Sequence, residues 1–233
     1  MPDRQKRLLL SVCGVAALGC ALTALVAAAL PLWVRGSVLC RTGAELVNAT
    51  GPELQQFLGE LQYGLFHGTR TKQCGLGGRR DRFRVFPDLL STVPVPLHVS
   101  VVFFCAVAAI FSCVAAIFFF FNAFGRPYET LQGPLGLYLW TCICGGSSFL
   151  VLVLFCCELK LHRLSERISN FGEENLVFQT FSEDLDRSFW LFLLVFLLQG
   201  LNAALTRLAT GARLPFQNQN KTELDGGAND LMY

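Results

Sequence analysis

Charged residues are scarce in this sequence. Only 15% of its 233 residues are Asp, Glu, Lys or Arg, against about 25% in an ordinary soluble domain. Asp, Glu and Lys are absent from four apolar stretches, residues 8–32, 97–121, 135–157 and 189–208. Each stretch has roughly the 17–25 residues that a membrane-spanning helix needs. The composition therefore excludes an ordinary soluble domain and predicts a four-helix membrane protein in contact with lipid.

Groupings of residues that carry catalysis or bind metal are also missing. The three histidines lie far apart without metal-ligand spacing, and no Gly-rich phosphate loop or nucleophile elbow is present. A net charge of +2 gives no electrostatic footprint for nucleic acid. Spans without acids or lysine argue against a proton relay or an ion-coupled transporter. We expect no enzyme, no cofactor, no metal site and no nucleic-acid partner.

The four spans divide the polar chain into five segments. These are a stub (1–7), a long first loop (33–96), a short turn (122–134), a second loop (158–188) and a tail (209–233). Three basic residues in the stub favour a cytoplasmic N-terminus. The first apolar stretch is longer than a signal-peptide core, so we interpret it as an uncleaved anchor. The alternative is a signal peptide cleaved near Ala27-Ala28-Ala29.

Cysteine placement indicates which side is outside. Eight of the ten cysteines lie in the spans, where they are typical small packing residues. The other two, Cys40 and Cys74, lie in the first loop near the sequon Asn48-Ala49-Thr50. Such an isolated pair indicates one disulfide in an oxidising compartment, the alternative being two free thiols. We therefore predict a plasma-membrane protein with extracellular loops, an N-glycan on Asn48, and a cytoplasmic tail whose sequon at Asn220 is unused.

The first loop shows patterns of regular structure. Thr50 and Glu53 fit a capping box, and an apolar series at helical spacing follows at Leu54, Phe57, Leu58 and Leu61. Residues 33–34, 63–66 and 82–86 have strand composition. We expect a small extracellular antiparallel β-sheet and one short helix on an otherwise all-α bundle. A basic cluster, Arg79, Arg80, Arg82 and Arg84, reads as a solvated strand face, with an acidic partner surface as the alternative.

The second loop differs in charge. It begins with an apolar stripe at helical spacing (Leu161, Leu164, Ile168 and Phe171), which predicts that the third span continues outward as an amphipathic helix. Acidic residues dominate the rest, so the two loops are candidates to face each other. Trp33, Trp140 and Trp190 lie near predicted span ends, as in an aromatic belt.

Ordered motifs along nearly the whole chain resemble the clarin family. They are Pro31-Leu-Trp33, Val38-Leu-Cys40, Leu46-Val-Asn-Ala-Thr50, Gln62-Tyr-Gly-Leu-Phe66, Gln73-Cys-Gly-Leu76, Phe86-Pro-Asp88, Gly133-Pro-Leu-Gly-Leu-Tyr138, Leu164-Ser-Glu-Arg167, Ser188-Phe-Trp190 and Asp230-Leu-Met-Tyr233. The resemblance implies a four-span glycoprotein of sensory hair cells and photoreceptors. It further implies a role in hair-bundle and synapse organisation with links to actin, hearing and balance.

A more remote resemblance concerns the first loop. Trp33 with Gly64-Leu65-Phe66 is similar to the Trp…Gly-Leu-Trp signature of the claudins. Phe66 replaces the second tryptophan, and Cys40 precedes the Gly-Leu element where claudins place both cysteines after it. This departure weighs against a barrier role, although a claudin-like bundle with a sheet fits the pattern. Two classes remain: a membrane organiser, or an adhesion, barrier or channel subunit that binds partners through its loops.

The chain stops on Leu231-Met232-Tyr233. A PDZ groove takes an extended peptide as an added strand, with the last side chain and the one two before it pointing into the groove. Tyr233 and Leu231 occupy those positions, and the alternative is a chance apolar end. We therefore predict a PDZ-domain scaffold as a cytoplasmic partner.

Overall fold

Four long antiparallel helices form one end of the molecule in the computed structural model, which describes residues 3–75, 77–125 and 134–210. They are α1 (Asp3–Ala29), α3 (Val95–Phe124), α4 (Pro134–Leu161) and α6 (Arg187–Thr210). All four are long and apolar enough to cross a membrane. The predicted four-helix membrane bundle is therefore confirmed.

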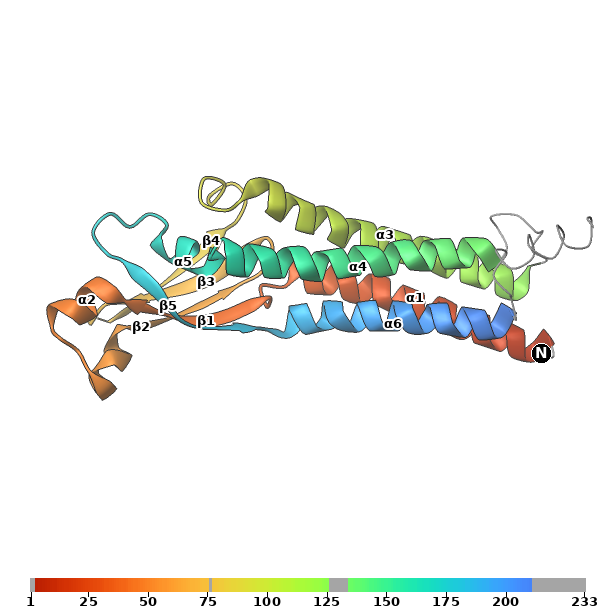
Figure 1. Cartoon of the computed structure of the whole chain (residues 1–233), viewed down its shortest axis with the longest axis horizontal. Coiled ribbons are helices and arrows are strands. Elements are labelled where there is room, and N and C mark those ends of the chain that lie inside the picture. The colour runs from red at the N-terminus through yellow and green to blue at the C-terminus, as the bar shows by residue number, and fades with distance from the viewer. Residues whose placement is uncertain (1–2, 76, 126–133, 211–233) are drawn as a thin grey trace, which may run out of the picture.

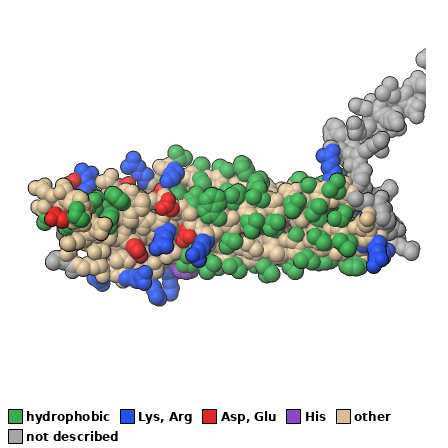
Figure 2. Space-filling model, turned by 90° about the horizontal axis from the view of Figure 1, so that it is seen from below, with side chains coloured by type: hydrophobic (Ala, Val, Ile, Leu, Met, Phe, Trp, Pro, Cys, Tyr) green, Lys and Arg blue, Asp and Glu red, His purple; other side chains and the backbone are tan. Residues whose placement is uncertain are grey.

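Small residues let the helices of the bundle approach closely. Ala17, Ala21 and Ala24 are buried on one face of α1, and Gly14 leaves room for the ring of Phe120, whose nearest atom would lie 3.1 Å from an added Cβ. Large apolar side chains point outward instead, and Figure 2 shows them as a belt over the helical part of the molecule. Such a belt suits a lipid environment, where close backbone packing rather than the hydrophobic effect holds helices together.

A five-stranded antiparallel sheet occupies the other end of the molecule (Figure 1). Its strands are β1 (Val34–Cys40), β2 (Leu58–Tyr63), β3 (His67–Gln73), β4 (Gly78–Arg84) and β5 (Phe178–Leu185), in the order β4-β3-β2-β1-β5. Two short helical segments, α2 (Arg41–Leu46) and η1 (Gly51–Phe57), connect β1 to β2. One apolar core runs from the sheet into the adjoining half of the bundle, so the two parts share their packing.

The prediction of a helix over Leu54–Leu61 is wrong. Only a 3₁₀ helix forms, it ends at Phe57, and Thr50 makes no side-chain capping hydrogen bond. Leu58 and Leu61 belong to β2, which pairs with β1 on one side and β3 on the other. Two ladders of backbone hydrogen bonds, together with the burial of Leu61, outweigh the helical spacing.

The second loop contains the predicted helix and also a strand that was not predicted. The amphipathic helix is present, although α4 ends at Leu161 and a left-handed residue, Arg163, separates it from α5 (Leu164–Asn170). Strand β5 was not expected, although Phe178, Thr180 and Phe181 are residue types enriched in strands. It forms since pairing with β1 satisfies its backbone and its first residue, Phe178, is buried. The strand expected over 63–66 is wrong apart from Tyr63, which ends β2, because residues 64–66 connect β2 to β3.

Candidate functional site

Trp33 joins the sheet to the bundle. Its backbone N–H donates to the carbonyl of Tyr63 (3.0 Å), and its carbonyl accepts from the N–H of Asp186 (2.9 Å). Its indole N–H donates to the carbonyl of Ala27, 2.8 Å away in α1. The ring packs on Phe155 and Phe192, with centroids 4.7 and 5.5 Å away. Trp33 is fully buried, so it does not belong to an aromatic belt as expected.

The segment Gly64-Leu65-Phe66 lies against the chain that leads from α1 to Trp33. A Cβ on Gly64 would meet the Leu30 carbonyl oxygen at 2.4 Å and Pro31 Cα at 2.8 Å, so only glycine fits this close backbone approach. Leu65 is fully buried, whereas Phe66 remains 40% exposed. The structure therefore brings Trp33, Gly64 and Leu65 together and leaves Phe66 at the surface.

A buried histidine and glutamate complete this junction. His98 of α3 contacts Glu158 of α4, with 2.8 Å between Nδ1 and Oε1. The other ring nitrogen of His98, Nε2, lies 2.8 Å from the carbonyl oxygen of Leu65. Glu158 has no exposed surface. The pair therefore fixes the element that follows β2 to two helices of the bundle.

The geometry fixes how protons are placed in this pair. Because a carbonyl can only accept, Nε2 of His98 carries a hydrogen and donates it to Leu65. The contact between Nδ1 and Glu158 then needs one further shared proton, on either the ring or the carboxyl group. Within the described residues, Oε2 of Glu158 has no hydrogen-bond partner. Removing either His98 or Glu158 would therefore change both the charge and the hydrogen bonding of the junction.

Sequence reasoning did not single out this pair. In the sequence, His98 is one of the few polar residues of the second predicted span, and Glu158 is the first residue of the second loop. The available signal was that both residues lie at the same predicted membrane surface, one just inside a span and one just outside.

A second polar cluster extends the junction outward. The hydroxyls of Tyr63 and Ser165 lie 2.9 Å apart, and Ser165 donates to Glu183 of β5. Lys160 of α4 pairs with the same carboxylate at 2.8 Å. Burial raises the pKa of the Tyr63 phenol well above its ordinary value, so it remains a neutral hydroxyl at physiological pH. These bonds connect β2, β5, α4 and α5.

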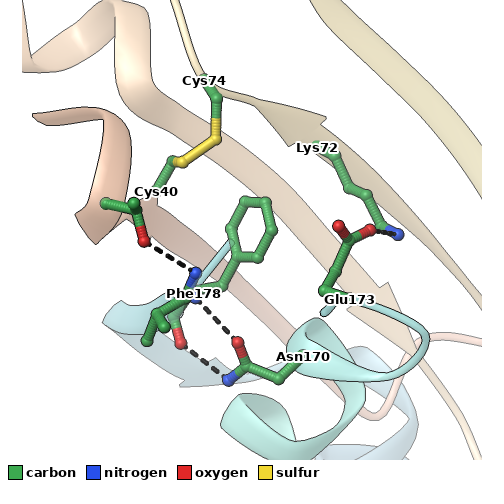
Figure 3. The surroundings of a disulfide bond; sticks show 8 residues. Cys40, Lys72, Cys74, Asn170, Glu173 and Phe178 are labelled. Atoms are coloured by element: carbon green, nitrogen blue, oxygen red, sulfur yellow. Dashed lines mark hydrogen bonds and ion pairs between the residues drawn. A yellow bond between two sulfur atoms is a disulfide. The ribbon is translucent and has the colours of Figure 1, made fainter. Parts of the chain in front are cut away.

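Arg70 ties the two loops together. This buried side chain of β3 donates from Nη1 to the carbonyls of Ile168 (2.8 Å) and Phe171 (2.9 Å), which belong to the end of α5. Its Nη2 lies 3.2 Å from the carboxylate of Asp81. A cation that satisfies the last carbonyls of a helix stabilises that helix end. Lys72 forms an ion pair with Glu173 beside it, so oppositely charged loops do meet here (Figure 3).

Cys40 and Cys74 form a disulfide, which Figure 3 shows with its surroundings. Their Cα atoms are 5.4 Å apart, and the bond links the end of β1 to the residue after β3. Nearby, the Asn170 side chain pairs with the backbone N–H and carbonyl of Phe178, at 2.8 and 2.9 Å. The disulfide thus holds the end of β1 to the end of β3, and the amide pairing holds α5 to β5.

Asn48 is exposed just after α2 and has a left-handed backbone conformation, with φ of 49°. We predict that it carries the only N-glycan, since it lies on the loop that we place outside the cell. Asn48→Gln should abolish the shift in gel mobility that a glycosidase produces. The matched control is Asn220→Gln, which should leave the shift intact. A shift that persists until Asn220 is also removed contradicts the orientation.

Leu231, Met232, Tyr233 and Asn220 lie outside the described residues, so the tail's predicted PDZ ligand has no structural account. Across residues 3–75, 77–125 and 134–210, no group of three or more His, Cys, Asp or Glu side chains could hold a metal ion. The described residues build a domain from both loops, residues 33–96 and 158–186, which is fixed to one end of the bundle through buried contacts and is called the outer domain below.

Comparisons with known proteins agree with this architecture. A family model described as Clarin-2-like matches residues 5–205. The chain is 48% identical to Clarin-1 of Homo sapiens and 47% identical to Clarin-1 of Mus musculus, over 100% of each chain. It is 38% identical to Clarin-2 of Mus musculus over 82% of both chains. With this coverage, including all four apolar helices, the chain belongs to the clarin family of four-span membrane proteins.

Proposed function

We propose that this protein is a non-enzymatic membrane organiser of sensory hair cells and photoreceptors. Its outer domain makes contacts outside the cell, and its cytoplasmic tail binds a PDZ-domain scaffold that leads indirectly to actin. Both termini lie in the cytoplasm and the bundle lies in the plasma membrane. In this role the protein supports the organisation of hair bundles and synapses, and through them hearing, balance and vision.

The observation that carries this proposal is the rigid connection between the outer domain and the helices. Trp33 bonds to β2, to the start of α6 through Asp186, and to α1 through Ala27. His98 and Glu158 fix the same region to α3 and α4. Every helix of the bundle is therefore linked to the sheet by buried contacts. An organiser needs this property, because a contact made outside must hold the helices and whatever is bound to their inner ends.

The tail supplies the test on the inner side. A peptide of the last ten residues should capture PDZ-domain scaffolds from hair-cell or retinal extract, since backbone amides of the PDZ groove bind the terminal carboxylate of Tyr233. One alanine added after Tyr233 should abolish both this capture and the localisation of the full chain. The matched control is Met232→Ala, which changes the side chain that points away from the groove and should bind normally. Unchanged binding after the alanine extension would refute the PDZ prediction.

A claudin-like role in adhesion, in a barrier or as a channel subunit is the second candidate. It is favoured by the five-stranded sheet seated on a four-helix bundle. At the junction Gly64 packs against Leu30 and Pro31, and Trp33 and Leu65 belong to the same buried cluster. Reconstitution in lipid vesicles separates the two roles. Self-assembled strands between membranes, or a conductance, would support this second candidate over the organiser.

A further inference from the structure

Unpaired positive charge in the outer domain is concentrated on one strand. Arg79, Arg80, Arg82 and Arg84 lie on β4 and are all exposed. Within the described residues, none of their guanidinium groups takes part in a hydrogen bond or an ion pair. Most other basic side chains of this domain have an acidic partner, as Arg70 has Asp81 and Lys72 has Glu173. The strand is thus positively charged without an internal partner to neutralise it.

The strand register sorts these arginines onto a common face. Phe83 points into the core, so its neighbours Arg82 and Arg84 point away from it. Arg80 has the same parity and shares their face. Side chains two residues apart on a strand are about 6.6–6.8 Å apart. The three arginine side chains therefore leave the backbone at even intervals along the edge of the sheet, because β4 is an edge strand.

The neighbouring strand adds hydrogen-bonding groups to this face. Arg80 pairs with Thr71, Arg82 with Thr69, and Arg84 with His67 in the antiparallel register. Residues directly opposite each other in such a pair project from the same side of the sheet. Two hydroxyl groups and the exposed imidazole of His67 thus accompany the row of arginines. This surface carries donors for anionic oxygens. The acidic residue of β4, Asp81, has the opposite parity and pairs with Arg70 on the other face of the sheet.

We propose that the outward face of β4 and β3, centred on Arg80, Arg82 and Arg84, binds a linear sulfated polysaccharide of the extracellular matrix. A planar guanidinium group can bind two oxygens of one anionic group through two parallel hydrogen bonds, and it carries a permanent charge. A linear polymer with repeated sulfate groups matches an evenly spaced row, and basic runs of this length are a known feature of heparin-type surfaces. The proposal rests on the extracellular placement of the first loop.

The same surface is poorly suited to a protein partner. Arginines along an edge strand oppose the addition of another strand, which is how edge strands avoid aggregation. Protein interfaces usually depend on a central apolar or aromatic anchor. On β4 the aromatic side chain, Phe83, is buried in the core and unavailable for such a contact. The exposed aromatic side chains nearest the row, Phe66 and Phe86, lie beyond the strand ends, and the ring of Phe86 packs on His98 of the bundle. The row itself carries charge without an apolar anchor, which fits a hydrated polyanion better.

Binding of the full chain in lipid nanodiscs to immobilised heparin tests the proposal. The triple variant Arg80→Thr, Arg82→Thr and Arg84→Thr keeps the strand-forming tendency and should bind more than about ten-fold more weakly at physiological salt. The slope of log K against log salt concentration should be less steep by about 2, because the loss of three charges lowers the number of counterions released on binding. The matched control is Arg41→Thr, Arg167→Gln and Arg187→Gln, which removes three exposed arginines outside β4 and should bind like the wild type.

Further variants and ligands sharpen the result. The triple variant Arg80→Lys, Arg82→Lys and Arg84→Lys keeps the charge without the two-pronged guanidinium group, so it should bind heparin with an intermediate affinity. Such binding would also show that substituting these three residues leaves the domain folded. Equal loss in the control triple would overturn the proposal in favour of general charge attraction. Equal binding of desulfated heparin would overturn it too, and tighter binding of poly-glutamate would point to an acidic protein. Since the purified chain is used, these outcomes are independent of whether the tail binds a PDZ domain.

Discussion

Glu158→Leu should lower the free energy of unfolding by about 3–5 kcal/mol, because it removes one partner of a buried pair. The substitution leaves Nδ1 of His98 without its contact in a site where neither side chain reaches solvent. The donation from His98 to Leu65 then remains as the ring's only bond within this junction. Denaturant unfolding of the purified chain in lipid micelles would measure the change.

A double variant distinguishes the pairing from simple loss of volume. His98→Phe combined with Glu158→Leu replaces the pair by apolar side chains, which often removes most of the cost of breaking a buried pair. Recovery should be incomplete, because the carbonyl of Leu65 loses its donor, at about 1–3 kcal/mol. Glu45→Leu, which breaks the exposed pair with Arg41, is the control and should cost less than about 1 kcal/mol. A cost below about 1 kcal/mol for Glu158→Leu would show that the pair does not stabilise the junction.

Loss of the disulfide is expected to have a comparable effect. The bond closes a loop with a sequence separation of 34 residues, which corresponds to about 3–4 kcal/mol from the restricted unfolded chain. Cys40→Ser and Cys74→Ser should each retain the protein in the secretory pathway, and the double variant should be no worse than either single one. The fraction at the cell surface and the maturation of the Asn48 glycan would report this.

The chain offers a matched control for the disulfide. Cys142 is a free, exposed cysteine of α4, so Cys142→Ser removes a thiol without breaking a bond and should reach the surface normally. Free alkylation of Cys40 and Cys74 in protein taken from the cell surface would count against the disulfide. Equal retention of Cys142→Ser would show instead that the bundle tolerates no change of cysteine.

Several features of the outer domain followed from local patterns. Alternation around Phe83 predicted a strand over residues 82–86, of which 82–84 form the end of β4. The apolar stripe from Leu161 to Phe171 predicted a helix beyond the third span, where α5 lies. Local patterns failed where pairing decided the conformation. Leu58 and Leu61 have helical spacing, yet they lie in β2 because β1 and β3 flank it on both sides. The acidic β5 forms for the same reason, through its pairing with β1.

The sequence by itself determined the membrane bundle, since the length and apolarity of a spanning helix are properties of one continuous segment. Only the tertiary structure decided the junction. His98 and Glu158 are 60 residues apart, and Arg70 lies 98 residues from Ile168. Such contacts depend on how separate segments meet in space. The pattern of residues within one segment contains no information on which other segment it will contact. The four-helix bundle was therefore predictable, whereas the buried groups that fix the sheet to it were not.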